Sequence, residues 1–375
     1  MTTARTSTRS PAAPADRVVL AQATRAGDVG VDDASARPWL VHEALAVPLA
    51  AVAQESAVAE AVSVHELLLE WHAVASVLQG LTESPRTREE IRSRGCDVAE
   101  LVLMSPVQPR QTFCTVGNYA RQVVEAAIDA GDGSDGPGAN GRRDAALMDV
   151  ERRKRDGQPY ICLTSSHRVS GPRGHLTLPV ELETLDWEVE VAAVLGAEGT
   201  GAAAVAGYCL ANDLTVRSRV LRSDVPTLGS DWVQSKGMPG SLPMGPWFVP
   251  TWQVPDVCAL RLQLYLNNRL MQDDCAADMI FGVDEQIAYL ARHTVLAAGD
   301  VVCTGSPAGF GAHHQRFLRP GDEVRASVAE LGEQEITCVA QSNAGDVSSS
   351  DNPEGNPPER SSIHDRARAC PGRDS

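Results

Sequence analysis

Residues 159–339 read as a series of short β-like segments separated by turns, and this pattern constrains the fold more than any other feature of the chain. The segments include HLTLPV, WEVEVAAVLG, DVVCTGSP, DEVRASVAELG and LRLQLYLNNRLMQ, the last with Asn267-Asn268 as a hairpin tip. One clear helix, VDEQIAYLARHTV, interrupts them. Because βαβ units hardly recur, a doubly wound parallel sheet fits poorly, and we predict an α+β protein with a mixed, rolled β-sheet.

The composition along the chain predicts its division into domains and tails. We predict a disordered tail at 1–16, a small N-terminal α/β domain at 17–105, a main domain at 106–340 and a second disordered tail at 341–375. In the N-terminal domain, SVHELLLEWHAVASVLQGL has the apolar spacing of a helix, with Ser63 as its N-cap.

The main domain opens with a β-like TFCTV and a helical YARQVVEAAIDA. The stretch GDGSDGPGANGRRD that follows is rich in Gly and Asp and too polar for a core, and it leads into a charged helical piece. Loops of this kind often cover binding sites. We therefore predict a loop or lid insertion at 131–158.

Charge and cysteine content exclude several classes of protein. The 375 residues carry 33 basic and 49 acidic side chains, a net charge of −16, and contain no basic stripe, which argues against nucleic-acid binding. Nine cysteines are scattered with no C-x-x-C pair, so a zinc ribbon or a disulfide framework is not indicated. No apolar run reaches the ~18 residues of a membrane span. We expect a cytoplasmic protein that does not bind membranes.

The segment LDWEVEVAAVLG is the most informative for function. In a strand, Asp186, Glu188 and Glu190 point to one side, which continues into the apolar Ala192 and Val194. Carboxylates that lead into a buried stretch repel one another unless a proton or a cation lies between them. An edge strand with a solvated acidic face is the alternative.

A second segment, GYCLAND, ends an apolar run at Asp213. Together with Glu188 and Glu190 it would supply three oxygen ligands to a hard dication. Ligation by carboxylates alone, without His or Cys, favours Mg²⁺, Mn²⁺ or Ca²⁺ over zinc.

Three further positions are candidates for contacts with a substrate. Lys236 lies in the Gly/Pro-rich WVQSKGMPGSLPMGPW, where its ammonium could reach an anionic ligand, although a solvated surface lysine is the commoner case. DVVCTGSPAGFG ends a β-run at Gly305 and Ser306, where small residues leave backbone N–H groups free to approach a carboxylate. An ordinary tight turn is the alternative there.

The ordered combination of NYxxxxxE, DWEVEVAAVLG, GYCLANDLTVR, DWVQSKGMPGSLPMGPW, MIF and GDVVCTGSPAGFG resembles the fumarylacetoacetate hydrolase family over about residues 106–339. The resemblance implies that family's mixed β-roll, a homodimer, and an Mg²⁺, Mn²⁺ or Ca²⁺ ion. It also implies roles at matching positions: metal ligands at Glu188, Glu190 and Asp213, and substrate contacts at Arg217, Lys236, Gly305 and Ser306.

The chain departs from the family at other positions. Hydrolytic members usually carry N-Y-x-x-H-x-x-E, whereas NYARQVVE has Gln122 at the histidine position and keeps Glu125. Glutamine cannot take up a proton, although its amide can position a water. The family's F-x-K lysine falls near Thr164, and its S-A-R-D-x-Q run is altered at Val220.

The resemblance implies a metal-dependent hydrolase that acts on a small 2-oxo or diketo acid. We expect it to cleave a C–C bond of an acylpyruvate or β-diketo acid through a metal-stabilised enolate. Glu125 and Gln122 would place the water, and Lys236 would assist at the reacting group. An isomerase (tautomerase) or decarboxylase on a 2-oxo or 2-hydroxydienoate acid is one alternative, and a catalytically silent member is another. His167 or the pair His313-His314 could also supply the missing base.

Overall fold

The computed structural model describes residues 13–14, 16–27, 35–53, 57–130, 137–196 and 202–341. The two predicted tails lie almost wholly outside these residues, so their disorder stays a prediction. All described residues belong to one unit of residues 1–341, and the predicted domain boundary near residue 105 also stays a prediction. Within the described part of the chain, no helix is long and apolar enough to cross a membrane.

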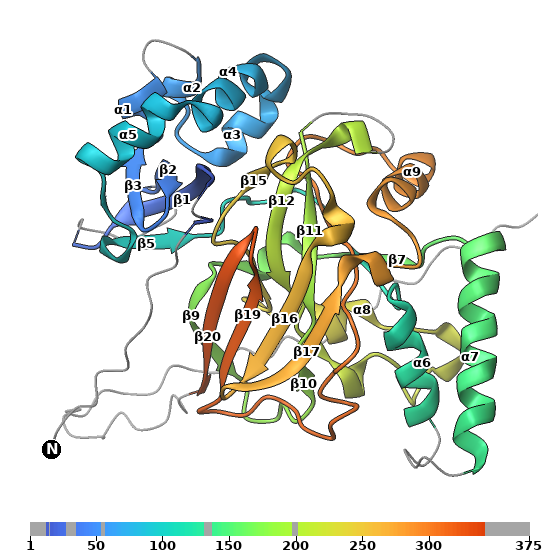
Figure 1. The fold of residues 1–375 in the computed structure, drawn as a ribbon. Coiled ribbons are helices and arrows are strands. Elements are labelled where there is room, and N and C mark those ends of the chain that lie inside the picture. The colour runs from blue at the N-terminus through green and yellow to red at the C-terminus, as the bar shows by residue number, and fades with distance from the viewer. Residues whose placement is uncertain are drawn as a thin grey trace, which may run out of the picture. The chain divides into compact units, whose positions relative to one another are not determined.

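The N-terminal region forms a five-stranded antiparallel sheet with helices beside it, drawn in blue to cyan in Figure 1. In spatial order the strands are β4 (Cys96–Asp97), β3 (Leu45–Pro48), β2 (Arg37–His42), β1 (Val19–Arg25) and β5 (Leu101–Met104). The helices are α1 (Leu49–Ala53), α2 (Ala57–Glu60), α3 (Val64–Leu69), α4 (Trp71–Glu83) and α5 (Pro85–Arg94).

The predicted helix after Ser63 forms, but it is divided at Glu70 into α3 and α4. Ser63 caps α3 as predicted, because its Oγ accepts a hydrogen bond from the Glu66 N–H at 3.1 Å. The predicted apolar positions are buried in one cluster: Val64, Leu67, Leu68, Val74 and Leu78. Trp71 stacks on Trp252, with ring centroids 5.6 Å apart, and so connects α4 to the main domain.

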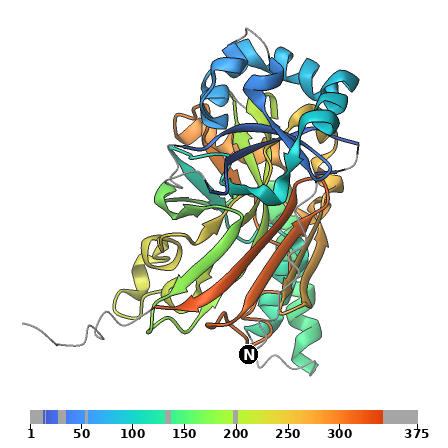
Figure 2. The ribbon, with the colours of Figure 1, turned by 90° about the vertical axis from the view of Figure 1, so that its left-hand side faces the viewer.

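Two mixed sheets, of six and five strands, form most of the remaining β-structure. The first has the order β15 (Val249–Pro250), β12 (Val205–Asn212), β11 (Val189–Leu195), β18 (Val301–Cys303), β6 (Thr112–Thr115) and β7 (Ile161–Thr164). The second has the order β17 (Arg269–Cys275), β16 (Arg261–Leu266), β19 (Glu323–Val328), β20 (Gly332–Ala340) and β9 (Arg173–Leu178). Parallel pairs β18–β6 and β20–β9 lie among antiparallel ones, which confirms the predicted α+β fold with mixed sheets. Figure 2 shows β19 and β20 side by side in orange to red.

The main domain also contains two short strand pairs and a tight hairpin turn. β10 (Leu185–Asp186) pairs with β13 (Thr215–Val216), and β14 (Leu242–Pro243) pairs with β8 (Val169–Ser170). At the predicted hairpin tip, Asn267 and Asn268 both have positive φ, 49° and 65°, as a two-residue turn between β16 and β17 requires.

Strand β11 separates two hydrophobic clusters because its side chains alternate between faces. Val189, Val191 and Ala193 belong to the cluster between the sheets, whereas Ala192 and Val194 belong to the cluster that includes α3 and α4. The strand is therefore buried on both faces, and the alternative of a solvated edge strand is wrong.

Helices α6 (Ala120–Asp129) and α7 (Pro137–Asp156) pack against each other and lie beside the sheets in Figure 1. Residues 131–136 lie outside the described residues. The predicted loop is wrong for 137–144, which form the first two turns of α7. Proline is favoured at the first position of a helix, and burial of Ala139 and Ala146 offsets the low helix propensity of the glycines there.

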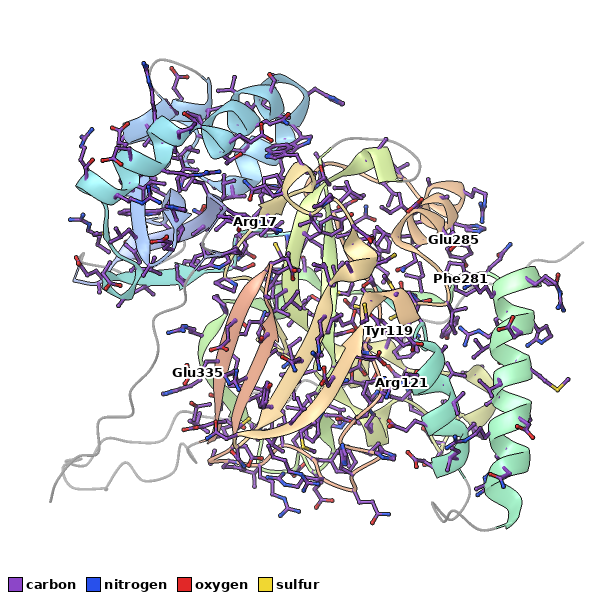
Figure 3. The ribbon with its side chains drawn as sticks, in the orientation of Figure 1. Arg17, Tyr119, Arg121, Phe281, Glu285 and Glu335 are labelled. Atoms are coloured by element: carbon purple, nitrogen blue, oxygen red, sulfur yellow. The ribbon has the colours of Figure 1, made fainter. Side chains whose placement is uncertain are left out.

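Helix α6 begins next to the end of β17. Figure 3 labels Tyr119 and Arg121 at this point. Tyr119 is fully buried and bridges to Met279, and the Arg121 N–H donates to Asp278 at 2.8 Å. The predicted later helix is α9 (Val283–His293). The start of α6 is thus fixed by the buried Tyr119 and by the hydrogen bond to Asp278, which determines where its remaining side chains point.

Candidate active site

The three predicted ligands Glu188, Glu190 and Asp213 converge in the main domain. One carboxylate oxygen from each lies within 4.8 Å of the others, and all three side chains are buried. Glu190 lies in β11 and Asp213 follows β12. These strands pair antiparallel with Val189 opposite Asn212, so the register brings the two acidic segments together.

The strand predicted over 186–195 is interrupted at Glu188, between β10 and β11. Side-chain amides take the place of the missing ladder bonds: Asn212 Oδ1 accepts from the Glu188 N–H at 3.0 Å, and Gln272 Oε1 accepts from the Val189 N–H at 3.1 Å. The Asp213 N–H donates to the Glu188 carbonyl at 2.9 Å. Glu188 and Asp213 are therefore held side by side by their backbones.

Lys236, at the end of α8 (Trp232–Lys236), points into this acidic group. Its Nζ lies 2.6 Å from Asp213 Oδ2 and 3.1 Å from Glu188 Oε2, and it donates to Thr215 Oγ1 at 2.7 Å. Only 3% of the residue is exposed, so the alternative of a solvated surface lysine is wrong. In the structure the ammonium bridges two of the predicted metal ligands.

Arg168 is a second buried cation at the site, and the sequence did not single it out. Its Nη1 lies 2.6 Å from Asp213 Oδ1, and the side chain is fully buried. The other guanidinium nitrogens donate to the Leu214 and Ser241 carbonyls and to Ser241 Oγ. A buried arginine surrounded by acceptors holds one geometry, so Arg168 fixes the orientation of Asp213.

Arg217 binds the acids from the other side. Its Nη1 lies 2.6 Å from Glu188 Oε1, its Nε donates to Asp186 Oδ2 at 2.8 Å, and its guanidinium lies 4.4 Å above the Phe310 ring. Among the described residues, its buried Nη2 has no hydrogen-bond partner. This nitrogen is the donor of Arg217 that remains available to an anionic group.

Asp186 has a structural role at this site. Its carboxylate accepts hydrogen bonds from the N–H groups of Gly311, at 2.6 Å, and Ala312, at 3.1 Å, in addition to the bond from Arg217. It therefore ties the chain segment around Phe310 to the start of the acidic strand.

Four buried carboxylates thus face three cations, Arg168, Arg217 and Lys236, which leaves one negative charge uncompensated. Glu190 carries this excess: among the described residues, its Oε1 is buried without a hydrogen-bond partner. An orphaned carboxylate oxygen beside two other carboxylates is what a hard dication would satisfy. The residues present therefore fit Mg²⁺, Mn²⁺ or Ca²⁺.

The pKa values show the same imbalance. Burial, with the charges of Asp213 and Glu188, raises the pKa of Glu190 well above its usual range. Burial also raises the pKa of Asp213, to about 6, against the opposing effect of Arg168. For Glu188 the effect of burial is overcome by Lys236 and Arg217, and its pKa is lowered. Glu190 is the acid whose ionised form most needs a further cation.

The segment after β18 contacts the same acids. The Gly305 N–H donates to Glu190 Oε2 at 2.8 Å, so this predicted substrate donor is engaged by a predicted metal ligand. Gly305 has φ +100°, and a Cβ there would stand 2.8 Å from the Asn118 side chain, so glycine is required. The Ser306 hydroxyl is buried and accepts from Gln272 Nε2 at 3.0 Å.

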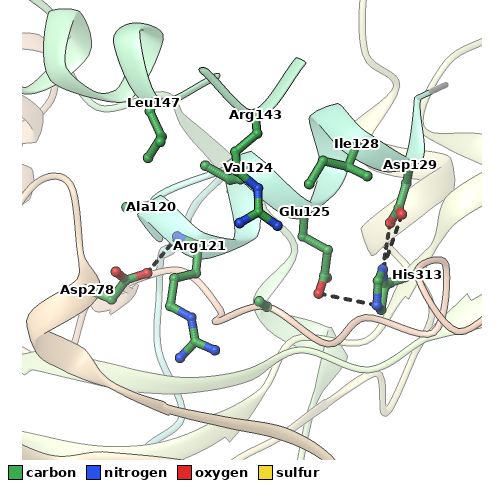
Figure 4. Close-up of a pocket in the computed structure, with 11 residues that line it drawn as sticks. Ala120, Arg121, Val124, Glu125, Ile128, Asp129, Arg143, Leu147, Asp278 and His313 are labelled. Carbon is green, nitrogen blue, oxygen red and sulfur yellow. Dashed lines mark hydrogen bonds and ion pairs between the residues drawn. The ribbon is translucent and has the colours of Figure 1, made fainter. Parts of the chain in front are cut away.

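Glu125 and Gln122 lie on α6, outside the acidic trio. Glu125 Oε1 accepts from the Gly309 N–H at 2.8 Å, and Glu125 lines a pocket of about 650 Å³ (Figure 4). Gln122 does not line this pocket, and its Oε1 lies 4.0 Å from the position of a Cβ on Gly117. The structure therefore does not place the two predicted water-positioning residues at one point.

A buried group of carboxylates and cations on a mixed β-roll is typical of an enzyme for small anionic substrates. Residues 111–339 match the model of the fumarylacetoacetate (FAA) hydrolase C-terminal family, which is more than half of the chain. The chain therefore belongs to the fumarylacetoacetate hydrolase family.

Curated relatives match about half of the chain. Fumarylacetoacetate hydrolase domain-containing protein 2 of Pongo abelii is 32% identical over 183 residues, 47% of this chain and 57% of that protein. A mitochondrial oxaloacetate tautomerase of Bos taurus is 33% identical with the same coverage. A putative hydrolase of Burkholderia lata is 35% identical over 47% of this chain and 64% of its own length. The matched segment thus spans less than two thirds of each relative.

Solved structures share the fold over most of the chain. A probable 2-hydroxyhepta-2,4-diene-1,7-dioate isomerase of Mycobacterium abscessus has a TM-score of 0.61 and 23% identity, covering 87% of this chain and all of that one. Maleylpyruvate hydrolase of Sphingobium sp. SYK-6, solved with manganese(II) and pyruvate, has a TM-score of 0.60 and 19% identity with the same coverage.

Proposed function

We propose that this protein is a divalent-metal-dependent hydrolase that cleaves a C–C bond in an acylpyruvate or related β-diketo acid. The observation that carries the proposal is the buried trio of Glu188, Glu190 and Asp213, with its uncompensated charge and the orphaned Oε1 of Glu190. The shared fold with a maleylpyruvate hydrolase that binds manganese(II) and pyruvate supports it.

The trio would hold Mg²⁺, Mn²⁺ or Ca²⁺. When bound, such an ion acts as a Lewis acid that favours negative charge on the oxygens of a 2-oxo acid. Lys236 and Arg168 orient Glu188 and Asp213 for this purpose, because they form ion pairs with these carboxylates. The buried setting excludes water and so strengthens each of these interactions.

The remaining groups would bind the substrate. Arg217 offers its free Nη2 to the substrate carboxylate, while its other nitrogens stay on Asp186 and Glu188. Ser306 offers a neutral hydroxyl next to Gly305. Glu125 lines the pocket between α6 and α7, where the rest of the substrate would enter. We also propose that the protein acts as a homodimer in the cytoplasm and takes a small-molecule acid as its substrate.

A second candidate is an isomerase (tautomerase) or decarboxylase that acts on a 2-oxo or 2-hydroxydienoate acid. Gln122 favours it, because glutamine cannot deprotonate a water. The 33% identity to an oxaloacetate tautomerase points in the same direction. Both candidates rely on stabilisation of an enolate, and they differ in whether a water is activated.

Product analysis by ¹H NMR separates the two candidates. The full chain is incubated with acetylpyruvate and with oxaloacetate in Mg²⁺, in Mn²⁺ and in EDTA. We expect metal-dependent release of acetate and pyruvate from acetylpyruvate, abolished in Glu188→Ala. Enol–keto exchange or decarboxylation of oxaloacetate, without acetate release, would favour the second candidate. No reaction with either substrate in any metal would contradict both, and a fully active Glu188→Ala would contradict the metal assignment.

A further inference from the structure

A histidine and two carboxylates meet in the pocket between α6, α7 and the segment after β18 (Figure 4). His313 lies between Glu125 and Asp129, which are four residues apart on one face of α6. The same pocket is lined by Arg121, Arg143 and apolar side chains, and it is open to solvent on one side. It therefore combines a titratable nitrogen, fixed acids and cations in one accessible space.

The two ring nitrogens of His313 have different partners. Nδ1 lies 3.0 Å and 3.2 Å from the two carboxylate oxygens of Asp129, within hydrogen-bond distance of both. Because a carboxylate accepts, the proton of a neutral imidazole belongs on Nδ1, and Nε2 then carries the lone pair. Nε2 lies 3.7 Å from Glu125 Oε2, a spacing at which both atoms can contact one water.

The groups that hold this arrangement are also attached to the acidic site. Glu125 is fixed through its other oxygen by the Gly309 N–H, and Trp187 Nε1 donates to the Gly309 carbonyl at 3.0 Å. Asp186 holds the N–H groups of Gly311 and Ala312, directly before His313. The segment that carries the imidazole is therefore fastened to residues 186–187, next to Glu188.

The pocket is close to the trio along the chain as well. Ala308 lines the pocket and Gly305 touches Glu190, and three residues of chain span at most about 11 Å. Phe310, in the same segment, lies against Arg217, which pairs with Glu188. One short segment thus contacts the acidic trio and also lines the pocket.

We propose that His313 is the general base of the reaction, with Asp129 as its positioning residue and Glu125 as the residue that holds the water. This inference rests on the proposed function. It assigns to His313 the proton transfer that Gln122 cannot perform. A structural role, in which His313 merely pairs with two acids at the surface, is the competing interpretation that the experiment must exclude.

In the hydrolytic step, Nε2 takes a proton from the water as the oxygen attacks the acyl carbonyl carbon. The C–C bond between that carbon and the methylene group then breaks. Its electron pair goes to the 2-oxo acid fragment as an enolate, which takes the proton back from His313. The products are a carboxylic acid and a 2-oxo acid, so one water is consumed and no oxidant or reductant is needed.

The kinetic test compares His313→Gln with His72→Gln. His72 is a matched control because it is an exposed residue of α4 and does not line the pocket. With acetylpyruvate and saturating Mn²⁺, we expect His313→Gln to lower kcat by about 10²–10⁴-fold, the usual contribution of a general base, with KM changed little. The kcat of His72→Gln should stay within twofold of the wild type. Asp129→Asn should lower kcat less than His313→Gln does.

The pH profile distinguishes a base from a structural contact. In the wild type, the pH profile of kcat should have the rising limb that a general base requires, and this limb should be absent in His313→Gln. The charged or titratable groups that contact the imidazole are Glu125, Asp129 and His314, and the same pocket is lined by Arg121, Arg143 and Asp278. A His313→Gln variant that keeps both its rate and the limb would overturn the inference and leave the proposed function standing.

A measurement independent of turnover completes the test. In ¹⁵N-histidine NMR spectra, with His313 assigned by its variant, the neutral ring should carry its proton on Nδ1, and Asp129→Asn should weaken that preference. A proton on Nε2 in the wild type would overturn the inference whatever the activity. Absence of turnover by the wild type would remove the proposed function and the reaction step together. The spectra would then show whether the ring has the orientation of a base.

Discussion

Among the residues that the structure describes there are two groups of three potential ligands, and they differ chiefly in burial. Glu188, Glu190 and Asp213 are buried in the main domain among three cations. Glu125, Asp129 and His313 line an open pocket, with side chains that are 18%, 31% and 39% exposed. Water solvates the second group, and the imidazole pairs with both acids. The buried acidic trio is not solvated in this way, so its charges must be balanced by other groups of the protein or by a bound ion.

Burial therefore decides which group should bind a dication and which should move a proton. An ionised carboxylate in a dry site is costly unless it is paired. The cations of the site pair with Glu188 and Asp213, whereas Glu190 Oε1 has no hydrogen-bond partner among the described residues. In the pocket, solvent access keeps proton exchange possible, and a catalytic base needs that freedom. In one reaction, the buried group would then bind the dication and the pocket group would transfer the proton.

The largest effect should come from removal of a buried cation. Arg168→Met takes the partner from Asp213 and leaves a buried carboxylate uncompensated, and we expect a loss of about 3–5 kcal/mol in the free energy of unfolding. The measurement is urea denaturation in EDTA.

Arg94→Met is the matched control for that variant. Arg94 pairs with Glu90 one turn away on α5, with 65% of its side chain exposed, so the loss should stay below about 0.5 kcal/mol. Equal losses in the two arginine variants would show that the acidic site is not a dry, charge-balanced cluster.

Metal should stabilise the protein through the buried group alone. Mn²⁺ at about 100 times its dissociation constant should add about 2.7 kcal/mol, because it binds the folded state selectively, and EDTA should reverse the effect. Thermal melting with and without the metal measures it. The metal-induced rise in melting temperature should vanish in Glu188→Ala and persist in Asp129→Asn. If the opposite pattern were found, the pocket would be the metal site and the assignment of tasks would be reversed.

The acidic trio could be predicted from sequence because its signal is local. Alternation along a strand places Glu188 and Glu190 on one side, and the polar end of an apolar run marks Asp213. Their convergence needed only the antiparallel register of two neighbouring strands, β11 and β12. The mixed sheet was predictable because short β-like segments follow one another through residues 159–339, whereas βαβ units hardly recur.

Other parts of the site depend on contacts between distant segments. Arg168 reaches Asp213 across 45 positions of chain, and no local pattern separates it from a surface arginine. The pairing of His313 with Asp129 spans 184 positions. The start of α7 was misjudged because its glycines and charges indicate a loop, whereas packing against α6 and the buried Ala139 and Ala146 stabilise a helix.

A third variant tests the uncompensated charge directly. Glu190→Gln keeps the shape of the side chain and removes the negative charge that neighbouring carboxylates oppose, as the raised pKa of Glu190 indicates. In EDTA at pH 7.5 we expect the variant to be more stable than the wild type, because a carboxyl group whose pKa is raised in the folded state costs stability above its unfolded-state pKa. In Mn²⁺ the order should invert, because the variant lacks a ligand. Urea denaturation in the two buffers measures the free energy of unfolding of the variant and of the wild type. A variant less stable than the wild type in EDTA would mean that the charge of Glu190 is already balanced by other groups of the protein.

The smallest effect should come from the open pocket. Asp129→Asn removes the acid that accepts from His313 Nδ1, but both side chains are partly solvated, so we expect the free energy of unfolding to change by less than about 1 kcal/mol. Urea denaturation of this variant and of Arg168→Met under the same conditions compares the two groups directly. A loss of several kcal/mol in Asp129→Asn would show that the pocket acids support the fold. A small loss combined with a clear fall in kcat would locate their contribution in the chemistry, because stability and turnover would then respond to different groups of residues.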